Sequence, residues 1–97
     1  MDVTSIATSG LRAAEIQVSN AAQNIASASA IGYQQQNVTQ TEAPDGGVQA
    51  EVSGSDQDVD TAQQLVSADI ATYDFQANLM VLKTQQQMQK SLLDIQA

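Results

Sequence analysis

The stretch LVSADIATYDFQANLMVL, residues 65–82, sets the expected architecture of this chain. Six of its residues recur at alternating spacings of three and four, a pattern that keeps one stripe of a helix facing a partner helix. The stripe consists of Leu65, Ala68, Thr72, Phe75, Leu79 and Leu82, and Leu93 returns to it after a polar gap. The N-terminal part of the chain repeats the pattern with Ala7, Leu11, Ala14, Val18, Ala21, Ile25 and Ala28. Matching stripes predict that the chain pairs its own ends or pairs with copies of itself.

We expect one mainly α-helical domain, residues 1–97, in which two long terminal helices pair as an antiparallel coiled-coil-like hairpin. The first helix lies within residues 1–33 and the second within residues 59–97. Residues 34–58 differ in composition from both and form a separate, acidic middle segment.

Two glycines in the N-terminal part bear on the first helix. We expect the first helix to run from Val3 to Ser29 and to end at Gly32, which can take the left-handed conformation found at helix ends. Gly10 lies inside this helix, where glycine costs about 1 kcal/mol relative to alanine. We therefore interpret Gly10 as a place where another helix approaches closely, with a kink or frayed end as the alternative.

The middle segment carries the signals of a small β-hairpin. The sequence Pro44-Asp45-Gly46-Gly47 is typical of a tight turn, because proline presets one torsion and glycine permits positive φ. After it, Val48, Ala50 and Val52 alternate with polar residues, which predicts a strand. Residues 37–41 supply the other arm. The alternative is a disordered acidic linker.

Charge and composition exclude several classes of partner. The chain has 3 basic and 11 acidic residues, a balance that argues against nucleic acid and against an anionic membrane surface. No apolar run approaches a membrane span, so we expect no membrane insertion. The N-terminus also lacks the features of a cleavable signal peptide. Few aromatic residues and many seam alanines predict a marginal monomer that gains buried surface by assembly.

The sequence offers no catalytic, cofactor or metal site. Histidine and cysteine are both absent, which removes the common metal ligands and the usual nucleophile–base pairs. The series at Asp56, Asp58 and Asp60 resembles the start of a calcium loop. However, Thr61 stands where that loop needs glycine, and Ser67 stands where it needs glutamate. We do not expect an enzyme.

Two asparagines lie beside the seams. Asn24 precedes Ile25, and Asn78 precedes Leu79. A buried asparagine must find a hydrogen-bonding partner and so fixes the register of a helix pair. Simple exposure on a helix flank is the alternative, and periodicity alone slightly favours it.

Several local motifs at the two ends of the chain match those of one known protein family. The N-terminal motifs are Ser9-Gly10-Leu11-Arg12-Ala13-Ala14, Asn24-Ile25-Ala26-Ser27-Ala28 and Gly32-Tyr33. The C-terminal motifs are Asp58-Val59-Asp60, Phe75-Gln76-Ala77-Asn78, Leu82-Lys83-Thr84 and Leu92-Leu93-Asp94-Ile95. Together these motifs resemble those of bacterial flagellar rod and hook proteins. Ser27 departs from the family pattern, which has asparagine there, and the middle segment is shorter than the family's insert.

The resemblance implies a structural subunit of the flagellar basal-body rod, which assembles through its terminal helices. Its partners would be copies of itself, other flagellar axial proteins and the type III export apparatus. It would lie in the periplasmic rod and be exported without a cleaved signal peptide. The expected helix-pairing residues are Leu11, Val18, Ile25, Leu65, Phe75, Leu79 and Leu82. The motif positions expected to contact other subunits are Gly10, Arg12, Asn24, Gly32, Tyr33 and Asn78.

Two other functions fit the same features less well. Small helical-hairpin proteins secreted by type VII systems share the length and acidity, but they carry a tryptophan-x-glycine turn and this chain has no tryptophan. A cytoplasmic chaperone or adaptor would use the acidic middle segment as a binding surface.

Overall fold

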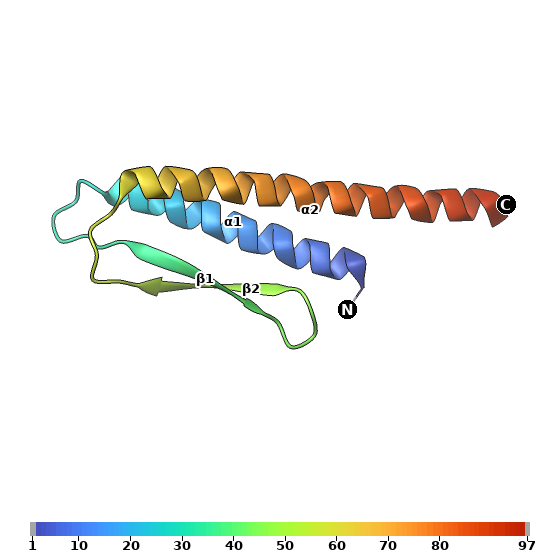
Figure 1. The fold of residues 1–97 in the computed structure, drawn as a ribbon, viewed down its shortest axis with the longest axis horizontal. Coiled ribbons are helices and arrows are strands. Elements are labelled where there is room, and N and C mark those ends of the chain that lie inside the picture. Colours follow the sequence, from blue (N-terminus) through green and yellow to red (C-terminus); the bar gives the residue numbers. More distant parts are fainter. Residues whose placement is uncertain (1, 97) are drawn as a thin grey trace.

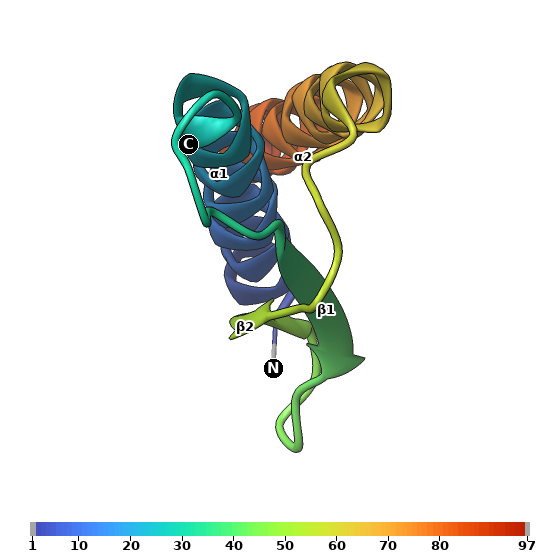
Figure 2. The ribbon, with the colours of Figure 1, turned by 90° about the vertical axis from the view of Figure 1, so that its left-hand side faces the viewer.

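The computed structural model describes residues 2–96, which form two long helices with a β-hairpin between them (Figure 1). The elements in chain order are helix α1 (Val3–Ser27), strand β1 (Gln36–Glu42), strand β2 (Val48–Gly54) and helix α2 (Thr61–Gln96). The helices pack along each other in opposite directions, and the hairpin lies against α1 (Figures 1 and 2). The prediction of a mainly α-helical fold with paired terminal helices is confirmed.

Both helices begin at an aspartate cap. The Asp2 carboxylate accepts a hydrogen bond from the Ser5 backbone N–H at 2.7 Å, and this bond lowers the pKa of Asp2. The Asp60 carboxylate accepts one from the Gln63 N–H at 3.1 Å. An aspartate side chain therefore satisfies one of the free N–H groups at the start of each helix.

The end of α1 differs from the expected one. The helix stops at Ser27 with Ala28 as its C-cap, two residues before Ser29. Gly32 does adopt the left-handed conformation, with φ of 81°, but it lies in the turn that follows the helix. In that turn the Tyr33 N–H donates to the Ala30 carbonyl at 3.3 Å. Gly32 therefore reverses the chain after the helix instead of ending it.

The β-hairpin has the predicted turn. β1 and β2 are antiparallel, and Val38 pairs with Val52. Gly46 and Gly47 both have positive φ, and the Ala43 N–H donates to the Gly47 carbonyl at 3.0 Å. Within the described residues the strands pack against α1 and not against α2. The hairpin therefore covers one side of α1 and leaves α2 to contact α1 alone.

The buried apolar side chains of the fold are small. Among the described residues, the fully buried apolar ones are all alanines: Ala7, Ala13, Ala14, Ala21 and Ala71. Small side chains let two helix backbones come close, because nothing bulky separates them.

The two most buried positions of α2 each lie one residue before a member of the predicted stripe. Gln64 and Ala71 are buried, whereas Leu65 is 55% exposed and Thr72 is exposed. The expected helix-pairing role of Leu65 is therefore corrected: Gln64 faces α1 at this level, through its hydrogen bond to Asn24, and Leu65 lies beside it.

The distal part of α2 extends past the start of α1. α2 has 36 residues and α1 has 25, lengths of about 54 and about 38 Å at 1.5 Å per residue. Gln85 is the last half-buried residue, and residues 86–95 are all exposed. We call residues 86–95 the overhang; Figure 1 shows it at the C-terminal end.

Candidate helix-pairing and assembly interface

Asn24 is the centre of a buried hydrogen-bond network that joins both helices to β1. Its side chain is 0% exposed. Its amide nitrogen donates to the Gln36 carbonyl and to Gln64 Oε1, both at 2.8 Å. Its amide oxygen accepts from the Gln36 N–H at 3.0 Å and from the Tyr33 hydroxyl at 3.1 Å. Two donors and two acceptor positions are all that an asparagine side chain offers, so every one is used.

A second buried amide ties the hairpin to the start of α2. The Gln35 side-chain oxygen accepts from the Asp60 N–H at 3.1 Å, and its backbone N–H donates to the Gln57 carbonyl at 2.8 Å. The Gln35 carbonyl accepts from the Ser55 hydroxyl at 2.5 Å. In the described part of the chain, no buried side-chain nitrogen or oxygen lacks a hydrogen-bond partner.

These two amides set the alignment of the helices. Sliding α2 by one residue would separate Gln64 from Asn24 and leave buried polar groups without partners, which costs about 1–3 kcal/mol for each group. The register-fixing interpretation of Asn24 therefore holds, and the exposed alternative is wrong. Gln35 and Gln64 are not recognisable from sequence patterns, because glutamine is usually a surface residue and carries no periodic signal.

Gly10 lies against Asn78 where the helices approach each other. A Cβ atom placed on Gly10 would be 2.6–2.7 Å from three atoms of the Asn78 side chain. Real side chains do not tolerate such distances. The interpretation of Gly10 as a close-approach position is confirmed, and Asn78 is the residue that it accommodates.

Replacing Gly10 by alanine tests this contact. Alanine should stabilise the helix by about 1 kcal/mol, but the clash involves Asn78 Cγ, so Asn78 must change χ1 and lose its 2.9 Å bond to the Asp74 carbonyl. We expect Gly10→Ala to raise the thermal midpoint clearly less in wild type than in an Asn78→Ala background. Circular dichroism melts of the four proteins measure this, and an equal change in both backgrounds would contradict the contact.

The predicted helix-pairing residues border the alanine contact. Leu11, Ile25, Leu79 and Leu82 are half-buried, whereas Val18 is 36% exposed and Phe75 is 39% exposed. Val18 and Phe75 come together, with Glu15, Ser19 and Thr72, around an open groove between α1 and α2. No hairpin residue lines this groove, whereas residues of β1 and the turn line the pocket beside Asn78. The groove therefore lies on the side away from the hairpin.

The six motif positions divide into three kinds. Asn24 and Tyr33 are network members, and Gly10 and Asn78 form the close contact. Arg12 and Gly32 are exposed. Four of the six thus hold this chain's own helices and hairpin together, and two remain at the surface.

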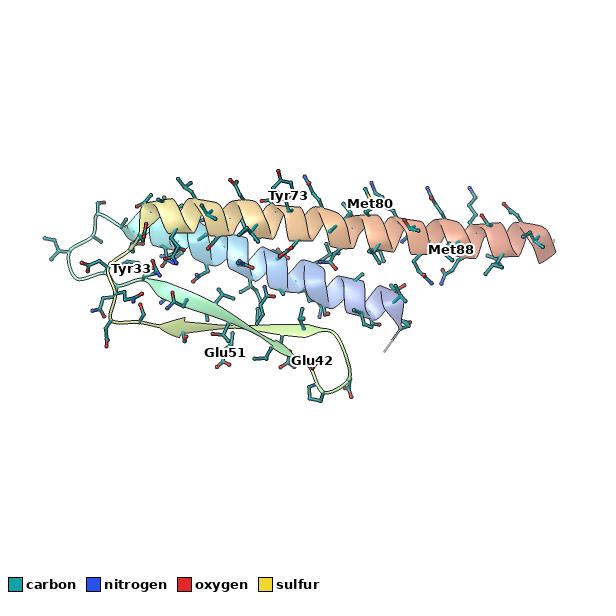
Figure 3. All side chains as sticks on the ribbon, in the orientation of Figure 1. Tyr33, Glu42, Glu51, Tyr73, Met80 and Met88 are labelled. Carbon is teal, nitrogen blue, oxygen red and sulfur yellow. The ribbon has the colours of Figure 1, made fainter. Side chains whose placement is uncertain are left out.

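Two large side chains stand exposed on the face of α2 turned away from α1. Tyr73 is 73% exposed and Met80 is 70% exposed, and both point away from α1 (Figure 3). Their spacing of seven residues places them on one side of the helix.

Neither helix of the described chain contains an apolar stretch of the length and hydropathy needed to cross a membrane. Within residues 2–96, no three acidic side chains gather where they could hold a metal ion. Searches against models of known protein families and against curated protein sequences find no match for this chain.

Proposed function

We propose that this protein is a structural subunit of the flagellar basal-body rod, which assembles with copies of itself and with other axial proteins through its terminal helices. The observation that carries the proposal is the amount of surface left open by the isolated chain. The resemblance of the terminal motifs to flagellar rod and hook proteins is the reason for proposing the rod as this assembly.

The isolated chain has a larger solvent-accessible area than a typical folded monomer of the same mass. Its accessible area is 6842 Å², whereas a folded monomer of 10.2 kDa exposes about 5,300 Å². The excess of roughly 1,500 Å² is comparable with what one partner contributes to one or two standard protein–protein interfaces. The shape explains the excess, because the molecule measures 64 × 25 × 14 Å. Packing of neighbours along the helices would cover it.

The composition of the open surface supports the same role. The exposed large apolar residues of α2 are Leu65, Val66, Ile70, Tyr73, Phe75, Met80, Val81, Met88, Leu92, Leu93 and Ile95. They follow the helix from near its start to its end, whereas the buried apolar side chains are alanines. Since alanine burial contributes little free energy, burial of these larger side chains between chains would add substantially to the hydrophobic stabilisation.

Incorporation into basal bodies tests the proposal. Leu79 is half-buried, and a carboxylate there would be forced toward the apolar contact between helices. We expect Leu79→Asp to be absent from purified basal bodies and to abolish motility in a strain that depends on this protein. The matched control is Thr84→Asp, which adds the same charge to an exposed position of the same helix and should be incorporated. Normal motility of Leu79→Asp at normal expression would contradict the proposal.

A further inference from the structure

A second apolar stripe runs along α2 on the side away from α1. Val66 and Tyr73 each lie two residues, or about 200°, after a residue that is buried toward α1, Gln64 and Ala71 respectively. The stripe repeats every 11 residues, a period that keeps it on one side of a straight helix. All of its members are exposed and none is charged. We call it the outer stripe: Val66, Ile70, Tyr73, Ala77, Val81, Thr84, Met88, Leu92 and Ile95.

α1 has an open face on the opposite side of the helix pair. Arg12 and Ser19 each lie two residues before a buried alanine, Ala14 and Ala21, and so point away from α2. Figure 2 shows the helices side by side with the hairpin below them. The hydrogen bonds to the hairpin involve residues outside this face: Ser9, Gln17, Asn20 and Asn24. We call the open face the small face, because it holds only short or polar side chains: Thr8, Arg12, Glu15, Ser19, Ala22 and Ala26.

The two faces suit each other in size, charge and area. Large side chains of the outer stripe meet short ones on the small face, so two helices can approach closely. The stripe has no charge and the small face has one base and one acid, whereas six of the 11 acidic residues lie within residues 34–60. The excess accessible area of roughly 1,500 Å², divided between two faces, is close to the about 800 Å² that each partner contributes to a standard interface.

The contact inside the chain sets the level at which the two faces meet. Asn24 lies opposite Gln64 and Gly10 lies opposite Asn78, and the residue numbers of each pair add up to 88. A neighbour that lies beside α2 without a shift along the helices keeps this relation. Ser19 of the neighbour is then within one residue of the level of Ile70.

At this level both charged residues of the small face meet polar groups. Arg12 of the neighbour lies within two residues of the level of Asp74, which is exposed. Glu15 of the neighbour lies level with Tyr73, whose hydroxyl can donate a hydrogen bond. Neither charge is therefore buried against a purely apolar surface, which would oppose the contact.

We propose that the outer stripe of one copy packs against the small face of the next copy, with the two helices antiparallel and without a shift along them. The contact repeats between chains the antiparallel arrangement that α1 and α2 have within one chain. Because the two faces lie on opposite sides of the molecule, a sideways displacement brings them together. Each copy keeps one free face, so the contact continues into a layer without closing. The inference rests on the proposed assembly role and names the contact that would perform it.

Cross-linking of the purified full-length protein tests the contact. The chain has no cysteine, so introduced cysteines give no background, and Ser19 and Ile70 are both exposed. Within one chain these residues lie on opposite sides of two helices whose axes are about 8–10 Å apart, too far for a disulfide. A chain with Ser19→Cys and Ile70→Cys should form a disulfide-linked ladder of trimers and larger species under mild oxidation. An equimolar mixture of the two single variants should give the mixed dimer in preference to either like pair.

The control for the level is Ala26→Cys combined with Ile70→Cys. Ala26 is exposed on the same small face but lies seven residues, or about 10 Å, further along α1. This pair should form several-fold less ladder. Equal yields from both pairs, or no ladder from the first, would overturn the proposed contact. A dimer of Ile70→Cys alone as the main product would overturn it too, because it would show that the outer stripe pairs with itself.

A charge placed in the outer stripe provides an independent check. Val66 lies level with Ala22 of the next copy, so Val66→Asp would bury a carboxylate in the contact. Added to the Ser19 and Ile70 cysteine variant, Val66→Asp should reduce the ladder several-fold while the helicity of the monomer is retained. Gln76→Asp adds the same charge at an exposed position outside the stripe and should leave the ladder unchanged. Equal ladders in both variants would contradict the contact.

All of these assays use purified protein. Their failure is therefore distinguishable from failure of the rod role, which is measured in basal bodies.

Discussion

Replacing Asn24 by alanine is expected to unfold most of the chain. The substitution removes four hydrogen bonds at a fully buried position and leaves the Tyr33 hydroxyl, the Gln64 side chain and both backbone groups of Gln36 without that partner. A buried polar group without a partner costs about 1–3 kcal/mol, and several are affected together. A helix pair whose core is alanine has little stability to lose. Helicity from circular dichroism and its urea midpoint measure the loss.

Asn20 provides the matched control. Its side chain donates to the same Gln36 carbonyl at 2.9 Å, but it is only half-buried, so water can replace it. We expect Asn20→Ala to cost at most about 1 kcal/mol and to leave the helicity close to wild type. Equal losses in the two variants would show that the buried network does not hold the helices together.

Replacing Ala71 by leucine is expected to have the second large effect. Ala71 is 0% exposed and lies in the contact between α1 and α2. Leucine would force the backbones apart at a point where only small side chains fit, a change that costs about 1–3 kcal/mol. For a domain of this size, the thermal midpoint should fall by roughly 5–20 °C.

Ala77→Leu is the control for this change. Ala77 is exposed on the same helix, so the substitution adds the same volume without entering the contact, and leucine is a good helix former. Its thermal midpoint should stay within a few degrees of wild type. A comparable drop in both variants would mean that the small residues at the helix contact are not required for packing.

The sequence predicted the elements of the fold and their order, because each carries a local signal. The turn at Pro44-Asp45-Gly46-Gly47 and the alternation in β2 depend on nearby residues only. The prediction of which side of α2 faces α1 was less accurate. Leu65 and Phe75 give the strongest periodic signal because they are large, yet the tight contact selects small residues.

The burial and hydrogen bonding of the amide side chains could not have been predicted from such local signals. Asn24 bonds to Gln64, which lies 40 residues away in the sequence, and only the folded chain brings them together. From periodicity, Asn24 and an exposed flank residue look alike. Its match to the Asn-Ile-Ala motif indicated that it matters, but the motif did not say whether its role lies within the chain or between chains.

Sedimentation velocity combined with far-ultraviolet circular dichroism, over a wide range of protein concentration, tests whether this chain is built to assemble. An alanine core and a large open apolar surface predict weak helicity at low concentration, which rises as species larger than a dimer form. A fully helical monomer at every concentration, or a fixed dimer, would contradict the assembly mechanism. That result would favour a chaperone or a secreted helical hairpin.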